Sequence, residues 1–147
     1  KRIPMYQFCY ASQSTSDKAV LLDDLTNILA EAREFNYRHG LSGVLYFADG
    51  YFFQCLEGNL QDLEMLIDKL YTDPRHHHIK RFAMSKITQA SFSDWSMRYI
   101  SKRDSIHQFC QTMGFEGFRP LQFEQQHIDV LLAQLVIHSR ENEHLDM

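Results

Sequence analysis

The sequence predicts an α+β domain with a mixed five-stranded sheet that carries two helices on one face. Three observations support this fold class: short aromatic and apolar runs typical of strands, amphipathic helical stretches between them, and the absence of low-complexity linkers. The segments follow one another in the order βαββαββ, and the remainder of the chain is helical in pattern. The expected fold is therefore ferredoxin-like, with additional C-terminal helices.

Five segments have the length and composition of strands. The third is apolar on both faces, as expected for a central strand that is covered on both sides. Asp49-Gly50 precedes it and favours a tight hairpin turn, because both residues tolerate positive φ. In the last strand, alternation predicts that Trp95, Met97 and Tyr99 share a face. The predicted strands span residues 5–11, 41–48, 51–56, 79–88 and 95–100.

The helices are predicted from apolar stripes of helical period. The first spans residues 19–39; a polar loop at 12–18 precedes it, Ser16 or Asp17 can cap it, and Gly40 can end it. The other predicted helices span 60–71, 105–113 and 125–138, and a polar tail occupies 139–147. We expect two parts, a core at 1–100 and a C-terminal helical extension at 101–147.

Composition excludes several classes of function. A net charge of -4 gives no reason to expect direct nucleic-acid binding, which needs excess Lys and Arg. No apolar run is long enough for a membrane span, and residues 1–5 do not resemble a secretory signal. The three cysteines, Cys9, Cys55 and Cys110, form no C-x-x-C pair. This number and spacing favour a reducing compartment, so we expect a cytoplasmic protein.

Known catalytic and metal motifs are also absent. The sequence contains no Gly-rich phosphate loop, no H-E-x-x-H and no G-x-S-x-G. His76, His77 and His78 are consecutive, and consecutive residues of regular structure cannot converge on one ion. No metal site is therefore predicted.

Two amides and one phenol stand out at positions that the pattern predicts to be buried. Gln54 interrupts the apolar third strand, and Asn36 lies on the apolar stripe of the first helix. A buried amide without a partner costs roughly 1–3 kcal/mol. Each amide alone could bond nearby backbone, but both together favour a buried polar ligand with an apolar face. Tyr10, on the first strand, is a neutral donor at pH 7, and taken alone it is better interpreted as an ordinary strand tyrosine.

These residues belong to a larger pattern that resembles the BLUF family, the sensors of blue light using FAD. The similarity runs in consistent order from about residue 6 to residue 100, although the loop at 12–18 is slightly long for the family. Five pieces carry it: Tyr10-x-Ser12, Asn36, Phe53-Gln54-x-Leu56-Glu57-Gly58, Asp73-x-Arg75-His76 and Phe92-x-x-Trp95-x-Met97.

The resemblance implies a non-covalently bound FAD between the two helices, above the sheet. Tyr10, Gln54 and Asn36 would form the hydrogen-bonded group at the polar edge of the flavin. Trp95 or Met97 would lie next to Gln54 and exchange places between states, although each could equally be plain core. The remaining implied cofactor contacts are Ser12, Arg33, Asp73, Arg75 and His76, of which Arg33, Arg75 and His76 are assigned to the ribityl-phosphate portion.

The residue types suit this chemistry. A phenol next to an excited flavin can pass on an electron and then a proton, and a glutamine amide can both accept and donate a hydrogen bond. In the family, Gln54 would end rotated or tautomerised, with a red-shifted flavin absorption that recovers in the dark. Rotation and tautomerism both remain open at this level.

The resemblance implies a photosensory signalling protein without enzyme activity. Its output would act on a separate protein, for example a transcriptional regulator, or through a homo-oligomer, with the C-terminal helices as the output or dimer element. Those helices could instead pack only on the sheet. Two other functions remain open: a light-independent flavin redox enzyme or thiol sensor using Cys9 and Cys55, and a cofactor-free ferredoxin-like interaction module.

Overall fold

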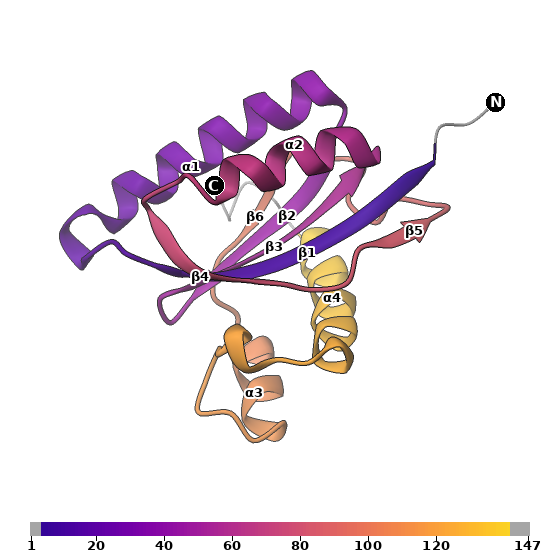
Figure 1. The fold of residues 1–147 in the computed structure, drawn as a ribbon. Coiled ribbons are helices and arrows are strands. Elements are labelled where there is room, and N and C mark those ends of the chain that lie inside the picture. The colour runs from indigo at the N-terminus through magenta and orange to yellow at the C-terminus, as the bar shows by residue number, and fades with distance from the viewer. Residues whose placement is uncertain (1–3, 142–147) are drawn as a thin grey trace.

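The computed structural model describes residues 4–141. Figure 1 shows a central sheet with helices on both sides. In chain order the elements are β1 (Met5–Ser14), α1 (Lys18–His39), β2 (Ser42–Ala48), β3 (Tyr51–Gly58), α2 (Leu60–Leu70), β4 (His76–Arg81), β5 (Ser85–Ile87), β6 (Arg98–Ile100), α3 (Asp104–Thr112), the 3₁₀ turn η1 (Pro120–Gln122) and α4 (Gln125–Ser139).

The sheet is mixed, as predicted. Its strand order is β4-β1-β3-β2-β6, and β5 also pairs with β1. All pairings are antiparallel except that of β2 with β6, which is parallel. Together with α1 and α2 on one face of the sheet (Figure 1), this confirms the ferredoxin-like α+β fold class.

Both faces of the sheet are covered, which explains the continuous apolar run in β3. Phe52 and Leu56 pack into a cluster under α1 and α2, whereas Phe53 and Cys55 pack into a second cluster with the C-terminal helices. The split follows the period of two along a strand. The C-terminal helices therefore share a hydrophobic core with the sheet, and α4 contributes Leu131 to it.

The predicted caps are present. The Asp17 side chain accepts hydrogen bonds from the backbone N–H groups at the start of α1, and Gly40 ends that helix with a φ of 67°. Asn59 caps α2 in the same way. The Asp49-Gly50 turn has positive φ at both residues, as expected for the hairpin.

Several predicted segments differ from the structure at their boundaries. The strand expected at 79–88 is divided into β4 and β5, so the sheet has six strands. β4 begins at His76 because this edge strand pairs with the polar end of β1, where no apolar alternation signals a strand. β1 itself continues to Ser14, so the polar loop expected at 12–18 is shorter.

The last strand is also shorter than the predicted 95–100. Only Arg98–Ile100 pairs with β2, and the preceding residues form an irregular segment. Without strand geometry the period of two does not apply. Trp95 packs against the cluster on the side of the C-terminal helices, whereas Met97 and Tyr99 belong to the cluster under α1 and α2. The expectation that Trp95 shares a face with Met97 and Tyr99 is therefore wrong.

Side chains of the sheet hold the segment that precedes α4. The Asp49 carboxylate accepts a hydrogen bond from the backbone N–H of Phe118 at 2.9 Å. The Lys80 ammonium donates to the backbone carbonyls of Leu121 and Phe123. Across the described part of the chain, no helix combines the length and apolarity that a bilayer crossing requires.

Candidate functional site

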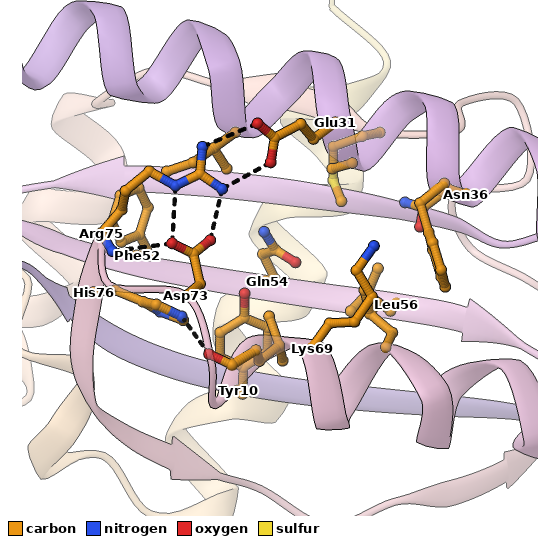
Figure 2. Close-up of a pocket in the computed structure, with 16 residues that line it drawn as sticks. Tyr10, Glu31, Asn36, Phe52, Gln54, Leu56, Lys69, Asp73, Arg75 and His76 are labelled. Carbon is orange, nitrogen blue, oxygen red and sulfur yellow. Dashed lines mark hydrogen bonds and ion pairs between the residues drawn. The ribbon is translucent and has the colours of Figure 1, made fainter.

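A pocket lies between α1 and α2, above β1 and β3 (Figure 2). It contains about 670 Å³ of space when its open mouth is counted. Its lining is mostly apolar, with a few polar groups. The lining residues are Tyr10, Ile28, Glu31, Ala32, Phe35, Asn36, Phe52, Gln54, Leu56, Leu66, Lys69, Leu70, Asp73, Arg75, His76 and Met97.

Tyr10 and Gln54 form the floor of the pocket. They are direct partners across the antiparallel β1–β3 pair, and both are buried. In Figure 2 the Tyr10 hydroxyl points toward the Gln54 amide, and no hydrogen bond is drawn from either group to the other lining residues. Burial, and secondly the Asp73 carboxylate, raises the pKa of the Tyr10 phenol, so the phenol is a neutral donor.

Asn36 lies in the last turn of α1 and is fully buried. Its amide nitrogen donates to the backbone carbonyl of Ser96 at 2.6 Å. Its amide oxygen Oδ1 is buried and has no hydrogen-bond partner within residues 4–141. Because a buried acceptor without a donor is costly, this oxygen indicates a ligand that brings an N–H or O–H group to the pocket.

An ion-pair cluster lies at the opposite end of the pocket in Figure 2. The Arg75 guanidinium contacts both carboxylate oxygens of Asp73, at 2.8 and 2.7 Å, and the Glu31 carboxylate at 2.8 Å. Burial opposes ionisation of Asp73, but the hydrogen bonds from Arg75 outweigh it and lower the pKa of that carboxyl. The cluster joins α1 to the start of β4 across the pocket.

His76 connects the pocket to β1. Its Nε2 lies 3.0 Å from the backbone carbonyl of Leu70, and its Nδ1 lies 2.6 Å from the Ser12 hydroxyl. A carbonyl only accepts, so Nε2 carries the hydrogen and Nδ1 accepts from Ser12. Burial lowers the pKa of His76, which favours this neutral form. Ser12 itself does not line the pocket and reaches it only through His76.

The two switch candidates lie in different places. Met97 is 3% exposed and lines the pocket. Trp95 lines a separate hollow, and its ring lies 5.8 Å from the Arg98 guanidinium and 6.0 Å from that of Arg140. Arg33 does not line the pocket either; its Nε donates to the backbone carbonyl of Met97 at 3.1 Å.

Lys69 and Phe35 line the pocket but were not identified from the sequence. The Lys69 ammonium lies 4.3 Å from the centre of the Phe35 ring, and Figure 2 shows the side chain reaching from α2 into the pocket. The only signal in the sequence is that Lys69 follows the apolar stripe of α2. This position does not distinguish a pocket lysine from a solvated one.

The remaining histidines lie outside the pocket lining. His77 and His78 are exposed on the edge strand β4, with their rings 4.1 Å apart. Within the described residues no three His, Cys, Asp or Glu side chains gather in a way that could hold a metal ion.

The donor set suits a flat aromatic ligand with one polar edge, such as an isoalloxazine. The apolar walls can cover the faces of such a ring, and in Figure 2 Tyr10 and Gln54 lie near the centre of the lining with Asn36 toward one end. A ring edge that carries both an N–H donor and carbonyl acceptors can satisfy the Asn36 oxygen and the Tyr10 hydroxyl together. The residues present therefore fit a flavin.

Comparison with known proteins points to the same ligand. The sequence profile of BLUF, described as sensors of blue-light using FAD, matches residues 5–98. The structure of BlsA in its ground state is 43% identical, with a TM-score of 0.87 over 90% of this chain and 88% of that chain. The dark-state structure of BlrB, at 23% identity and a TM-score of 0.77 over 92% of this chain and 98% of that chain, shares the fold.

Curated relatives include much longer proteins. Photoactivated adenylate cyclase subunit beta of Euglena gracilis is 34% identical over 97 residues, which are 66% of this chain and 11% of that protein. The match thus spans about a tenth of that protein's length, and the cyclase activity is stated of that protein alone. The family profile, by contrast, covers more than half of this chain. The chain therefore belongs to the BLUF family of blue-light sensors, whose domains bind a flavin.

Proposed function

We propose that the flavin of this blue-light receptor is FAD, held non-covalently between α1 and α2, and that light rearranges the hydrogen bonds around Gln54. The observation that carries the proposal is the cross-strand pair of Tyr10 and Gln54 on the floor of the pocket. The unpartnered amide oxygen of Asn36 supports it, because this oxygen requires a donor such as the ring N–H of a flavin.

In this proposal each polar residue of the floor has one task. Asn36 fixes the ring edge through Oδ1 while its nitrogen stays on the Ser96 carbonyl. Tyr10 donates its phenolic hydrogen toward Gln54. The Gln54 amide accepts on its oxygen and donates from its nitrogen, which a carboxylate at neutral pH cannot do.

When bound, the flavin supplies a strong one-electron oxidant upon absorbing blue light. Tyr10 would give an electron to the bound, excited flavin and its hydroxyl proton to the Gln54 amide. Both would then return to Tyr10, and Gln54 would remain rotated or tautomerised with a new hydrogen bond to the ring edge. Met97 lies in the same pocket and is the better placed of the two switch candidates to respond.

The anionic tail of the cofactor would lie at the charged parts of the lining. Arg75 is already paired with Asp73 and Glu31, whereas the Lys69 ammonium lies over the Phe35 ring. We therefore assign Lys69, with Arg75 and His76, to the phosphate end of the tail. Asp73 orients Arg75, Ser12 orients His76, and Arg33 acts through the Met97 carbonyl.

For the output we propose contact with a separate protein, for example a transcriptional regulator, or with a second copy, in the cytoplasm and without catalysis. In support, residues 101–141 pack on the sheet face opposite the pocket and contact β6, which directly follows Met97. The outer face of α4 also exposes apolar side chains, with Val130 44% and Ile137 65% exposed.

The experiment that tests the proposal is a visible absorption spectrum of the purified protein before and after blue light. We expect a flavin spectrum that shifts to the red and recovers in the dark, and extraction of the cofactor as FAD. Turnover of a reductant without light would instead support a redox enzyme. The thiols give little support to that function, since Cys9 and Cys55 are buried and burial raises the pKa of Cys55. Colourless protein after flavin-supplemented expression would indicate a cofactor-free module.

A further inference from the structure

Glu57 is a buried carboxylate that does not belong to the pocket. It lies on β3 three residues after Gln54, so its side chain points to the opposite face of the sheet. It is 1% exposed, and acidic side chains are almost never buried to this degree unless paired. The carboxylate therefore needs hydrogen-bond partners inside the protein.

Its partners are neutral donors of one loop and one neighbouring strand. Oε1 accepts from the backbone N–H groups of Ser91 and Phe92, both at 2.9 Å. Oε2 accepts from the Ser91 N–H at 3.0 Å and from the Gln7 amide at 3.0 Å. Hydrogen bonds to an ionised acceptor are stronger than neutral ones, so Glu57 fixes the backbone at 91–92 firmly.

The fixed backbone begins the segment that reaches the pocket. Four residues after Ser91, the carbonyl of Trp95 accepts a hydrogen bond from the Gly43 N–H at 3.2 Å. The carbonyls of Ser96 and Met97 then accept from the side chains of α1. Segment 91–97 is therefore anchored by Glu57 at its start and by α1 at its end.

The segment changes sides of the sheet between its two anchored ends. Between them the chain crosses from the side of the C-terminal helices, where Phe92 and Trp95 pack, to the side of α1 and α2, where Met97 packs. If the backbone at 91–92 moved, the chain would cross the sheet at a different residue, and a different side chain would face α1 and α2. Before the regular pairing of β2 with β6 begins at Arg98, β2 holds this segment by one backbone hydrogen bond, from the Gly43 N–H to the Trp95 carbonyl.

We infer that Glu57 is a positioning residue of the light sensor, which holds segment 91–97 so that Met97 lines the pocket and Trp95 stays behind the sheet. This inference rests on the proposed function, because it gives Met97 its place beside Gln54. It adds a residue outside the lining of the flavin pocket that sets the position of the segment leading into it.

Trp95 makes the inference measurable, because it is the single tryptophan of the chain. In flavin-loaded protein kept dark, acrylamide quenching of tryptophan fluorescence reports how well Trp95 is held. Glu57→Met removes both acceptor oxygens at similar size, and we expect stronger quenching. Glu57→Gln keeps one acceptor oxygen for Ser91 and Phe92, and should stay near wild type.

The second readout is dark recovery after blue light. Without the hydrogen bonds from the backbone at 91–92 to Glu57, the dark arrangement of the site is less stable. Glu57→Met should therefore slow dark recovery by up to about tenfold, which corresponds to ~1.4 kcal/mol. Flavin affinity should not change, because Glu57 does not line the pocket. Glu116→Met, at an exposed acid on the loop after α3, is the matched control and should match wild type in both readouts.

Wild-type quenching and recovery in Glu57→Met would overturn the inference, as would a Glu57→Gln protein that behaves like Glu57→Met. If Glu57→Met does not fold, Glu57→Asp is the variant that tests the inference. It keeps the charge but its shorter side chain reaches the loop less well, so quenching and recovery should change in the same direction by a smaller amount. If the wild type shows no light response, the proposed function fails, whereas the quenching comparison still tests the position of Trp95 without light.

Discussion

Tyr10 and Gln54 stand directly opposite each other on neighbouring strands, on the sheet face that α1 and α2 cover. Side chains at such paired positions start about 4.5–5.5 Å apart at Cβ, so no loop is needed to bring them together. A slip of one residue in the register would turn one of them to the other face. The strand pairing itself therefore sets the relay that we propose.

His76 should make folding stability depend on pH. Burial lowers its pKa in the folded protein, so the unfolded chain, with an ordinary histidine pKa near 6.5, takes up the proton first. The stability contribution is present above that value and is lost as the pH falls below it. Urea unfolding at a series of pH values should show this slope, and His76→Gln should reduce it.

Ser12→Ala separates the titration of His76 from its hydrogen bond. This variant loses the hydroxyl that donates to Nδ1 but keeps the imidazole. It should lower stability at every pH while leaving the slope in place. Equal slopes in wild type and His76→Gln would contradict the assignment.

Lys69 should favour flavins that carry phosphate. Lys69→Met is expected to weaken FAD and FMN binding by on the order of 0.2–1 kcal/mol, the usual size for an exposed charge. Riboflavin binding should be nearly unchanged. Dissociation constants from flavin fluorescence quenching measure this. Lys86→Met, at an exposed lysine of β5, is the control. A loss that is equal for all three flavins would show that the charge is not the cause.

The C-terminal helices should be part of the folding unit. Leu131 of α4 is fully buried in the cluster that the sheet shares with these helices. Leu131→Ala should therefore cost about 2–5 kcal/mol in the free energy of unfolding. Its neighbour Val130 is exposed, so Val130→Ala should stay within roughly 0.5 kcal/mol. Urea unfolding compares the two, and a small effect of Leu131→Ala would indicate a loosely attached extension.

Local signals made most of the fold predictable. Asp17 and Gly40 mark the ends of α1 through side-chain capping and a left-handed backbone, and both features depend only on nearby residues. The apolar run around Gln54 likewise indicates a strand covered on both faces, and the strand is indeed central. The burial of Asn36 and Gln54 was predictable because each places an amide in an apolar pattern, and their role beside a flavin, with that of Tyr10, stays a prediction.

The segment before β6 was not predictable by the same means. Asn36 holds the Ser96 carbonyl across 60 positions of sequence, and Arg33 holds the Met97 carbonyl across 64. Alternation along the strand cannot report such bonds, so the opposite orientations of Trp95 and Met97 could not be predicted. The place of residues 101–147 as a separate part stays a prediction, and residues 142–147 lie outside the described part of the chain.

The most direct test of the Tyr10–Gln54 relay is the light-minus-dark absorption spectrum of Tyr10→Phe, recorded beside Gln54→Leu. Tyr6→Phe, on the same face of β1 four residues before Tyr10, is the control. We predict that Tyr10→Phe and Gln54→Leu retain flavin but lose the red shift, whereas Tyr6→Phe responds like wild type. A full, reversible red shift in either of the two pocket variants would contradict the account.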